Sequence, residues 1–222
     1  PPNSDQFTTV WNELKFLAKR NIKTILMIGG AGGAFGNLFL NFEVFYKMLY
    51  DTIKSYPVIK GVDLDIEENV SLDNVKMFIN RIKNDFGKDF IISMAPLAIS
   101  LTEDTPGMGG FVYKDLYNSK EGKLVNYFNC QFYGNFNFDT YDRIIKNGYK
   151  ASKINMGMLS EDFEDNFPTA LNEIKSVKDK YASMGGIYVW EYCDCPPDRN
   201  NHEKWASEVN TVLSKITNCM LM

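Results

Sequence analysis

The stretch KGVDLDIEEN, from Lys60 to Asn69, determines how the rest of the sequence is interpreted. Three acidic residues, Asp63, Asp65 and Glu67, alternate in it with aliphatic residues. Successive side chains of an extended strand point to opposite faces, so the three carboxyl groups are expected to share one face. Crowded carboxylates repel one another and lose hydration when buried. The stretch therefore predicts a strand with one acidic face, and the crowding needs a chemical explanation.

Two explanations do not involve catalysis. The acids could form the solvated face of an edge strand, as alternation often indicates. They gather, however, toward the carboxyl end of the strand, where α/β folds place ligands and catalytic residues. The acids could also bind Mg²⁺, which prefers carboxylate oxygens. Met94, Tyr133 and Met158 occupy the corresponding ends of other strands, and only Glu191 adds an acid there.

Proton transfer is the explanation we favour. We expect Asp63 and Asp65 to keep the outermost carboxyl, that of Glu67, protonated near neutral pH and able to protonate a leaving group. Glycoside hydrolysis needs such an acid. Tyr133 and Trp190, at other predicted strand ends, add a hydroxyl group and an aromatic surface for a sugar ring. The strand ends therefore predict a sugar site, in which Glu68 is given no chemical role.

Predicted strands alternate with predicted helices along the whole chain. This order predicts βαβ units and a parallel sheet, either an open doubly wound sheet or a (β/α)₈ barrel that lacks two strands. The expected strands are 23–28, 61–67, 90–94, 127–133, 153–158 and 187–190. The expected helices are 7–20, 38–55, one from an N-cap at Ser71 to Gly87, one over 141–145 capped by Asp139, and those over 168–181 and 204–216.

Composition excludes several classes of protein. The net charge of −4 gives no basic surface for nucleic acid, and no apolar run is long enough to span a membrane. The 222 residues suffice for one large domain or two small ones. Four cysteines include Cys193 and Cys195, whose one-residue gap does not match zinc-site spacing. His202 is predicted to be a surface residue. Because it is the only histidine, a Ser-His or Cys-His triad is disfavoured.

The glycine-rich turn MIGGAGGAFGN, over 27–37, is a second candidate site. A nucleotide-binding G-x-G-x-x-G would need glycine where Phe35 stands, and no Gly-Lys-Ser/Thr follows. Asp51, at the distance of a ribose-binding acid, falls inside a predicted helix. The turn is therefore expected to be a tight strand-to-helix connection that lets a ligand or the backbone approach closely.

Five short motifs follow one another in a fixed order. They are Met27–Gly30, Lys60–Glu67, Ser93–Pro96, Asn129–Tyr133 and Gly185–Tyr192. In this order they resemble glycoside hydrolase family 18, which contains chitinases and endo-β-N-acetylglucosaminidases. The first resembles the family's S-x-G-G motif, and the second its D-x-x-D-x-D-x-E signature. The resemblance covers nearly the whole chain.

The resemblance implies a reaction in which the protein supplies no nucleophile. Glu67 would protonate the glycosidic oxygen while the substrate's own 2-acetamido oxygen attacks the anomeric carbon, giving an oxazolinium intermediate and retention. Asp65 would orient the acetamido group and share a proton with its neighbours, and Asp63 would tune Asp65. Tyr133 would hydrogen-bond the acetamido carbonyl. The residues that would bind the sugar are Trp190, Gln131, Met94 and Gly30.

The resemblance also implies an α/β fold, the TIM (β/α)₈ barrel. This chain would supply strands three to eight, with the first two missing, so we expect residues 1–222 to form a single catalytic domain that is incomplete at its N-terminus. Lys60 replaces the first acid of the signature and Met27 replaces the serine of S-x-G-G. Both are expected early in their strands, away from the site.

The implied substrate is an N-acetylglucosamine-containing polysaccharide or N-glycan, such as chitin or chito-oligosaccharides cleaved at β-1,4 bonds. We expect no cofactor, no metal and no nucleic acid partner, and an extracellular or secretory location; the oligomeric state is not predicted. The alternative is a catalytically silent chitin- or glycan-binding lectin, inhibitor or storage protein on the same barrel. Such relatives typically lose the terminal glutamate, and Glu67 is present.

Overall fold

The computed structural model describes residues 2–214, which belong to two compact units. Unit 1 is made of Pro1–Met94, Met108–Phe111 and Asp115–Asn126. Unit 2 is made of Ala95–Gly107, Val112–Lys114 and Tyr127–Met222. The predicted helix over 204–216 extends past the part of the chain that is described, as does Cys219.

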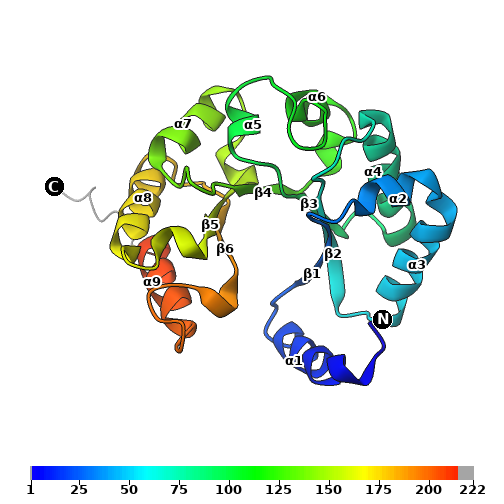
Figure 1. The fold of residues 1–222 in the computed structure, drawn as a ribbon, viewed down its shortest axis with the longest axis horizontal. Coiled ribbons are helices and arrows are strands. Elements are labelled where there is room, and N and C mark those ends of the chain that lie inside the picture. The colour runs from blue at the N-terminus through cyan, green and yellow to red at the C-terminus, as the bar shows by residue number, and fades with distance from the viewer. Residues whose placement is uncertain (1, 215–222) are drawn as a thin grey trace. The chain divides into compact units, whose positions relative to one another are not determined.

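Unit 1 is built on parallel strands that pair in chain order. They are β1 (Thr24–Gly29), β2 (Ile59–Asp65) and β3 (Ile91–Met94). Its other elements are η1 (Asp5–Phe7), α1 (Thr8–Ala18), α2 (Ala34–Leu40), α3 (Phe42–Ser55), α4 (Leu72–Phe86) and η2 (Gly122–Leu124), and α6 (Tyr113–Asn118) runs into it from unit 2. Helices α2, α3 and α4 lie together on one side of β2 (Figure 1), where the ring of Phe78 packs against the rings of Phe35 and Tyr46.

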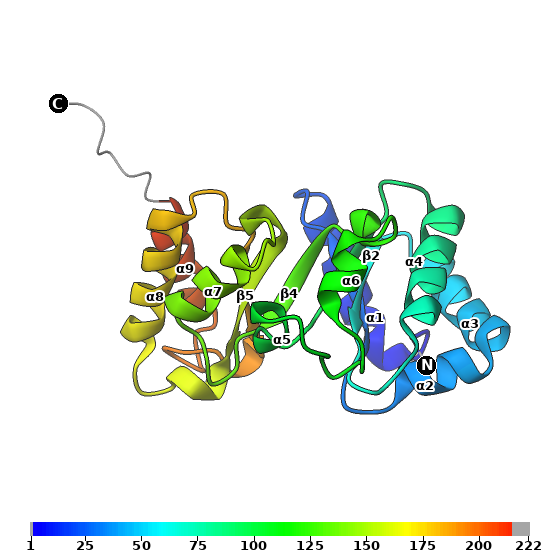
Figure 2. The ribbon, with the colours of Figure 1, turned by 90° about the horizontal axis from the view of Figure 1, so that it is seen from above.

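Unit 2 is also built on parallel strands that pair in chain order. Its parallel strands are β4 (Tyr127–Gln131), β5 (Ile154–Leu159) and β6 (Gly186–Trp190). Its other elements are α5 (Ile99–Thr102), α7 (Phe138–Lys146), η3 (Ala151–Lys153), η4 (Ser160–Phe163), α8 (Phe167–Lys180), η5 (Tyr192–Asp194) and α9 (Glu203–Ser214). Helices α7, α8 and α9 lie side by side (Figure 2). The buried carboxylate of Asp142 in α7 joins α7 to the end of α8, because it accepts hydrogen bonds from Lys180 and Tyr181.

The strands confirm the predicted alternation, with shifts of one or two residues at their ends. The helices differ more. The predicted helix over 38–55 is two helices that meet at Asn41, whose backbone leaves the helical region at φ −140° and ψ 61°. Asp139 was predicted to cap the helix that is α7 in the structure. Asn137 caps it instead, because its Oδ1 accepts the N–H of Thr140 at 2.9 Å. Ser71 caps α4 as expected, its Oγ accepting the N–H of Asp73 at 3.2 Å.

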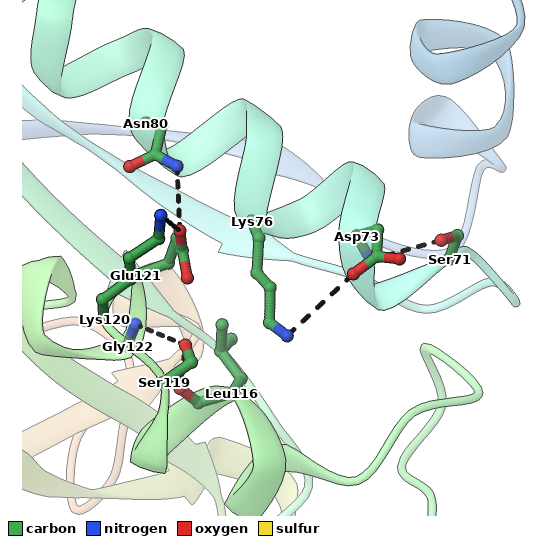
Figure 3. A network of polar contacts seen from close by, with 9 residues as sticks. All are labelled: Ser71, Asp73, Lys76, Asn80, Leu116, Ser119, Lys120, Glu121 and Gly122. Carbon is green, nitrogen blue, oxygen red and sulfur yellow. Dashed lines mark hydrogen bonds and ion pairs between the residues drawn. The ribbon is translucent and has the colours of Figure 1, made fainter.

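A polar network within unit 1 holds the segment after α6 against α4 (Figure 3). The carboxylate of Glu121, which is 5% exposed, accepts a hydrogen bond from Asn80 of α4 at 3.0 Å. Burial raises the pKa of Glu121, but the hydrogen bond from Asn80 and further hydrogen bonds outweigh burial, so that the pKa is lowered. Ser119 accepts the Gly122 N–H at 3.1 Å, which fixes the turn that carries Glu121.

We expect Glu121→Ala to lower the free energy of unfolding by roughly 1–2 kcal/mol, because the Asn80 amide loses its acceptor. The lowered pKa means that the carboxylate stabilises the fold above the ordinary glutamate range, so the difference from wild type shrinks as the pH falls. Urea unfolding at pH 7 and at low pH measures both effects. The control is Asp73→Asn, because the Asp73 side chain is 93% exposed and lies 4.0 Å from Lys76. Equal midpoints for wild type and Glu121→Ala at pH 7 would contradict the expectation.

No helix in the described part of the chain is both long and apolar enough to cross a membrane.

Candidate active site

The carboxyl end of β2 carries the predicted acids. Asp63 and Asp65 are 8% and 7% exposed, and Glu67 lies two residues beyond the strand and is half-buried. The aliphatic residues between them are completely buried on the other face, as predicted; they are Val62, Leu64 and Ile66. The register of β2 therefore puts two carboxyl groups into a nearly dry environment, with a third at its edge.

Burial raises the pKa of Asp65 to about 7, with further contributions from the negative charges of Glu67 and Asp63. A hydrogen bond between the Asp65 and Glu67 side chains adds to the shift, as does the charge of Glu68. A hydrogen bond between two carboxyl groups needs one proton, because a carboxylate has no donor. The raised pKa lets Asp65 keep its proton up to about neutral pH beside Glu67, and these two residues are called the acid pair below.

The raised pKa of Asp65 was not predicted from the sequence, and the role of Glu67 as the proton donor stays a prediction. The spacing of the acids indicated crowding but not which carboxyl is buried deepest. Glu67 lies past the end of β2, whereas Asp65 is its last residue. Desolvation, the largest cause of the shift, therefore acts on Asp65.

The glycine turn packs directly onto this strand end. The Gly30 N–H donates to the Asp65 carbonyl oxygen at 2.8 Å. Gly29 has φ +105°, and a Cβ there would lie 2.0 Å from the same oxygen, so no larger residue fits. A Cβ on Gly30 would lie 3.6 Å from Asp65 Oδ2. The turn thus approaches the acid pair through its backbone, as expected for a connection that leaves room for a ligand.

Strand register corrects two expectations about neighbours of the acids. Met27 is the register partner of Asp63 and shares its face, so it does not lie away from the site. Met94 pairs with Leu64 and is fully buried on the face opposite the acids, so we do not carry it into the proposed site. Ser93, which the sequence did not single out, pairs with Asp63 and is buried on the acidic face. Lys60 is exposed at the start of β2, as expected.

The sequence also gave no role to Glu68. Its Oε1 accepts the N–H groups of Phe35 and Gly36, the latter at 3.0 Å, at the start of α2. The only hint in the sequence was that a helix after a run of glycines has no capping side chain of its own.

The remaining predicted residues belong to unit 2. Gln131 ends β4, is 8% exposed, and donates from Nε2 to the Ala95 carbonyl at 3.0 Å. Tyr133 follows two residues later and is half-buried. Trp190 ends β6 with 48% of its surface exposed, which is unusual for an indole. Strand ends of unit 2 thus present an amide, a phenol and an open aromatic face.

Unit 2 also holds a group of possible metal ligands. Donor atoms of Glu191, Cys193 and Asp194 lie within 4.8 Å of one another, and two of these residues are exposed. Cys195 is not among them, because it is buried and its Sγ contacts the His202 carbonyl at 3.8 Å. His202 is half-buried beside the ring of Tyr192, and so it is not the surface residue that the sequence predicted.

The sequence pattern of the glycosyl hydrolases family 18 matches residues 3–166. The chain belongs to this family. The acid pair lies within the matched residues, and the predicted resemblance is confirmed. Chitinase 2 of Rhizopus oligosporus is 27% identical over 209 residues, which are 81% of this chain and 35% of that protein. The family-18 chain thus spans about a third of the length of this curated relative.

Two solved structures match closely, and the first is described as a family-18 protein. A fungal endo-β-N-acetylglucosaminidase is 31% identical, with a TM-score of 0.88 over 96% of this chain and 80% of that one. The chitinase ChiC of Aspergillus fumigatus is 27% identical, with a TM-score of 0.80 over 95% and 80% of the two chains. The predicted fold class, an α/β TIM barrel of which this chain is a part, is confirmed.

Proposed function

We propose that this family-18 chain is a retaining glycoside hydrolase that cleaves β-1,4 bonds of N-acetylglucosamine-containing glycans with the help of the substrate's acetamido group. The observation that carries the proposal is the acid pair at the end of β2, in which Asp65 has its pKa raised to about 7 and is hydrogen-bonded to Glu67. A proton held near neutral pH is what the leaving group of a glycoside needs.

In the proposed reaction the acetamido oxygen attacks the anomeric carbon while the bond from that carbon to the leaving oxygen breaks. Glu67, at the open edge of the pair, passes the pair's one proton to the leaving oxygen. Asp65, then a carboxylate, accepts a hydrogen bond from the acetamido N–H, which orients this group and balances the charge of the oxazolinium ion. Water then opens the ring with Glu67 as base, which restores the proton and retains the configuration.

The other predicted residues have binding or tuning roles. Asp63 adds the buried negative charge that raises the pKa of Asp65 further. Gly30 gives the sugar room beside the acid pair, since no side chain covers Asp65 there. For unit 2 we propose that the Tyr133 hydroxyl binds an acetamido carbonyl, that Gln131 hydrogen-bonds sugar, and that the exposed indole of Trp190 stacks on a sugar ring.

We further propose that residues 1–222 belong to one catalytic domain and that the protein acts in an extracellular or secretory compartment, where polymeric glycans are encountered. The substrate is chitin, chito-oligosaccharide or an N-glycan, because the relatives are named as chitinases and an endo-β-N-acetylglucosaminidase. The sequon Asn69-Val70-Ser71 suits such a compartment, and Asn69 is exposed.

The decisive experiment incubates the full-length protein with a fluorogenic chito-oligosaccharide and, separately, with a high-mannose N-glycan. Release of product from either supports the proposal and names the substrate class. Binding of chito-oligosaccharide by calorimetry without product from either substrate would replace the proposal with a lectin-like function. NMR of the first product separates retention, with the β-anomer formed first, from inversion.

A further inference from the structure

Glu68 makes the contact that joins the acidic strand segment to the helix after the glycine turn. Its Oε1 accepts two backbone N–H groups, those of Phe35 and Gly36, in the first turn of α2. The donors and the acceptor are more than thirty positions apart in the sequence, so this is a tertiary contact within unit 1. The residue follows Glu67 directly, but its side chain is committed to the helix start.

The first turn of α2 needs a partner from elsewhere. The N-terminal N–H groups of a helix have no acceptor within the helix, and a side chain at the N-cap usually supplies one. Here the N-cap is Gly33, with φ +67° and no side chain. A carboxylate is a favourable substitute, because the helix dipole places partial positive charge at this end.

The glycine turn is therefore held at two points. At one point Gly30 donates to the Asp65 carbonyl at 2.8 Å, and at the other the start of α2 is held by Glu68. The two anchoring residues, Asp65 and Glu68, lie on either side of Glu67 in the chain. A shift of α2 would thus move the turn relative to the acid pair.

The second carboxylate oxygen of Glu68 makes this contact a costly one. Oε2 is buried and makes no hydrogen bond to any residue that the structure describes. Burying an unsatisfied charged oxygen is costly. Gly33, at φ +67°, has a backbone conformation that strains larger residues, so a capping side chain at position 33 is no simple replacement for Glu68.

We propose that Glu68 is a positioning residue, whose carboxylate fixes the start of α2 and so holds the glycine turn at the distance from Asp65 and Glu67 that the sugar requires. The proposal rests on the hydrolase function proposed above. It assigns Glu68 no contact with the substrate.

The first test is Glu68→Ala. We expect kcat to fall roughly 10–100-fold, the range found when a supporting residue is removed from a site, with a much smaller change in KM. Hydrogen exchange of the Gly30 amide is measured alongside, since release of α2 should expose the bond from Gly30 to Asp65 and speed its exchange. This readout does not depend on catalysis.

The second test is Glu68→Gln, which keeps an oxygen acceptor for α2 and removes the charge. We expect most of kcat and the protection of Gly30 to be recovered. The groups that raise the pKa of Asp65, besides burial, are Glu67, Asp63 and Glu68. Because one negative charge is lost, the pair releases its proton at lower pH, and the fall of activity on the alkaline side should move to lower pH than in wild type.

Glu173→Ala is the matched control. Glu173 is also half-buried, and its carboxylate accepts the Phe138 N–H at 2.6 Å at the start of α7, within unit 2. We expect both alanine variants to have a lower melting temperature than the wild type, but only Glu68→Ala to have a lower kcat. The proposal is overturned if Glu68→Ala melts earlier yet keeps wild-type kcat and Gly30 protection.

The remaining outcomes are also informative. If Glu68→Ala does not fold, Glu68→Gln decides, because an unchanged pH profile together with lost Gly30 protection would contradict both expectations. If the wild type releases no product, the hydrolase function has failed, and Gly30 exchange alone then decides whether Glu68 holds the turn.

Discussion

Glu67→Gln is expected to lose roughly 10²–10⁴-fold in kcat on whichever glycan the wild type cleaves, because an amide cannot protonate the leaving oxygen. The side chain lies at the open edge of the acid pair and is half-buried, so the isosteric change should leave the fold and substrate binding nearly intact. Product release under single-turnover conditions measures the chemical step, and calorimetric binding of chito-oligosaccharide measures affinity.

The matched control for this loss is Glu13→Gln, an exposed glutamate of α1 in the same unit. It should turn over like the wild type. A Glu67→Gln variant that retains more than about a tenth of the wild-type rate would be too active for the loss of a general acid. Another proton donor would then have to be sought, with Asp65 the first candidate.

Asp65→Asn is expected to inactivate the protein and at the same time to stabilise it at alkaline pH. The pKa of this carboxyl is raised in the fold to about 7, from 3.8. An acid whose pKa is raised by folding contributes stability that is complete below its pKa in the unfolded chain. That stability is lost as the pH rises through its pKa in the folded protein. A neutral amide avoids that loss. The free energy of unfolding of the variant should therefore rise relative to that of the wild type between about pH 4 and pH 7. The difference should approach roughly 4 kcal/mol above pH 8.

Urea unfolding at pH 5 and pH 8.5 tests this sign directly. Asp89→Asn, at an exposed position of the same unit, should show the same difference from wild type at both values of pH. Burial of a strained or badly paired amide would instead make Asp65→Asn less stable than wild type throughout. That result would mean that hydrogen bonds to the carboxyl group, rather than its desolvation, dominate at this position.

Much of this architecture could be predicted from period and spacing. The alternation of acids with Val62, Leu64 and Ile66 fixed both faces of β2, since a period of two has only one solution when one face is buried. The order of strands and helices indicated a parallel α/β fold, and five ordered motifs indicated the family. These features depend on residues that are close in the sequence or on their order along it.

The features that could not be predicted depend on contacts between distant segments. Glu68 caps a helix more than thirty residues upstream, and no local pattern reports such a contact. Depth of burial, which puts the raised pKa on Asp65, is a property of everything packed around the strand. Met94 was misplaced because its motif showed that it lies on a strand but not which residue it pairs with in the neighbouring one.

The double attachment of the glycine turn has a consequence for the entropy of catalysis. Asp65 and Glu68 are immobilised by contacts that form when unit 1 folds, so the backbone that carries Glu67 between them is ordered before any sugar arrives. A substrate then need not contribute the free energy of ordering the acid, and more of its binding energy remains for distorting its own ring.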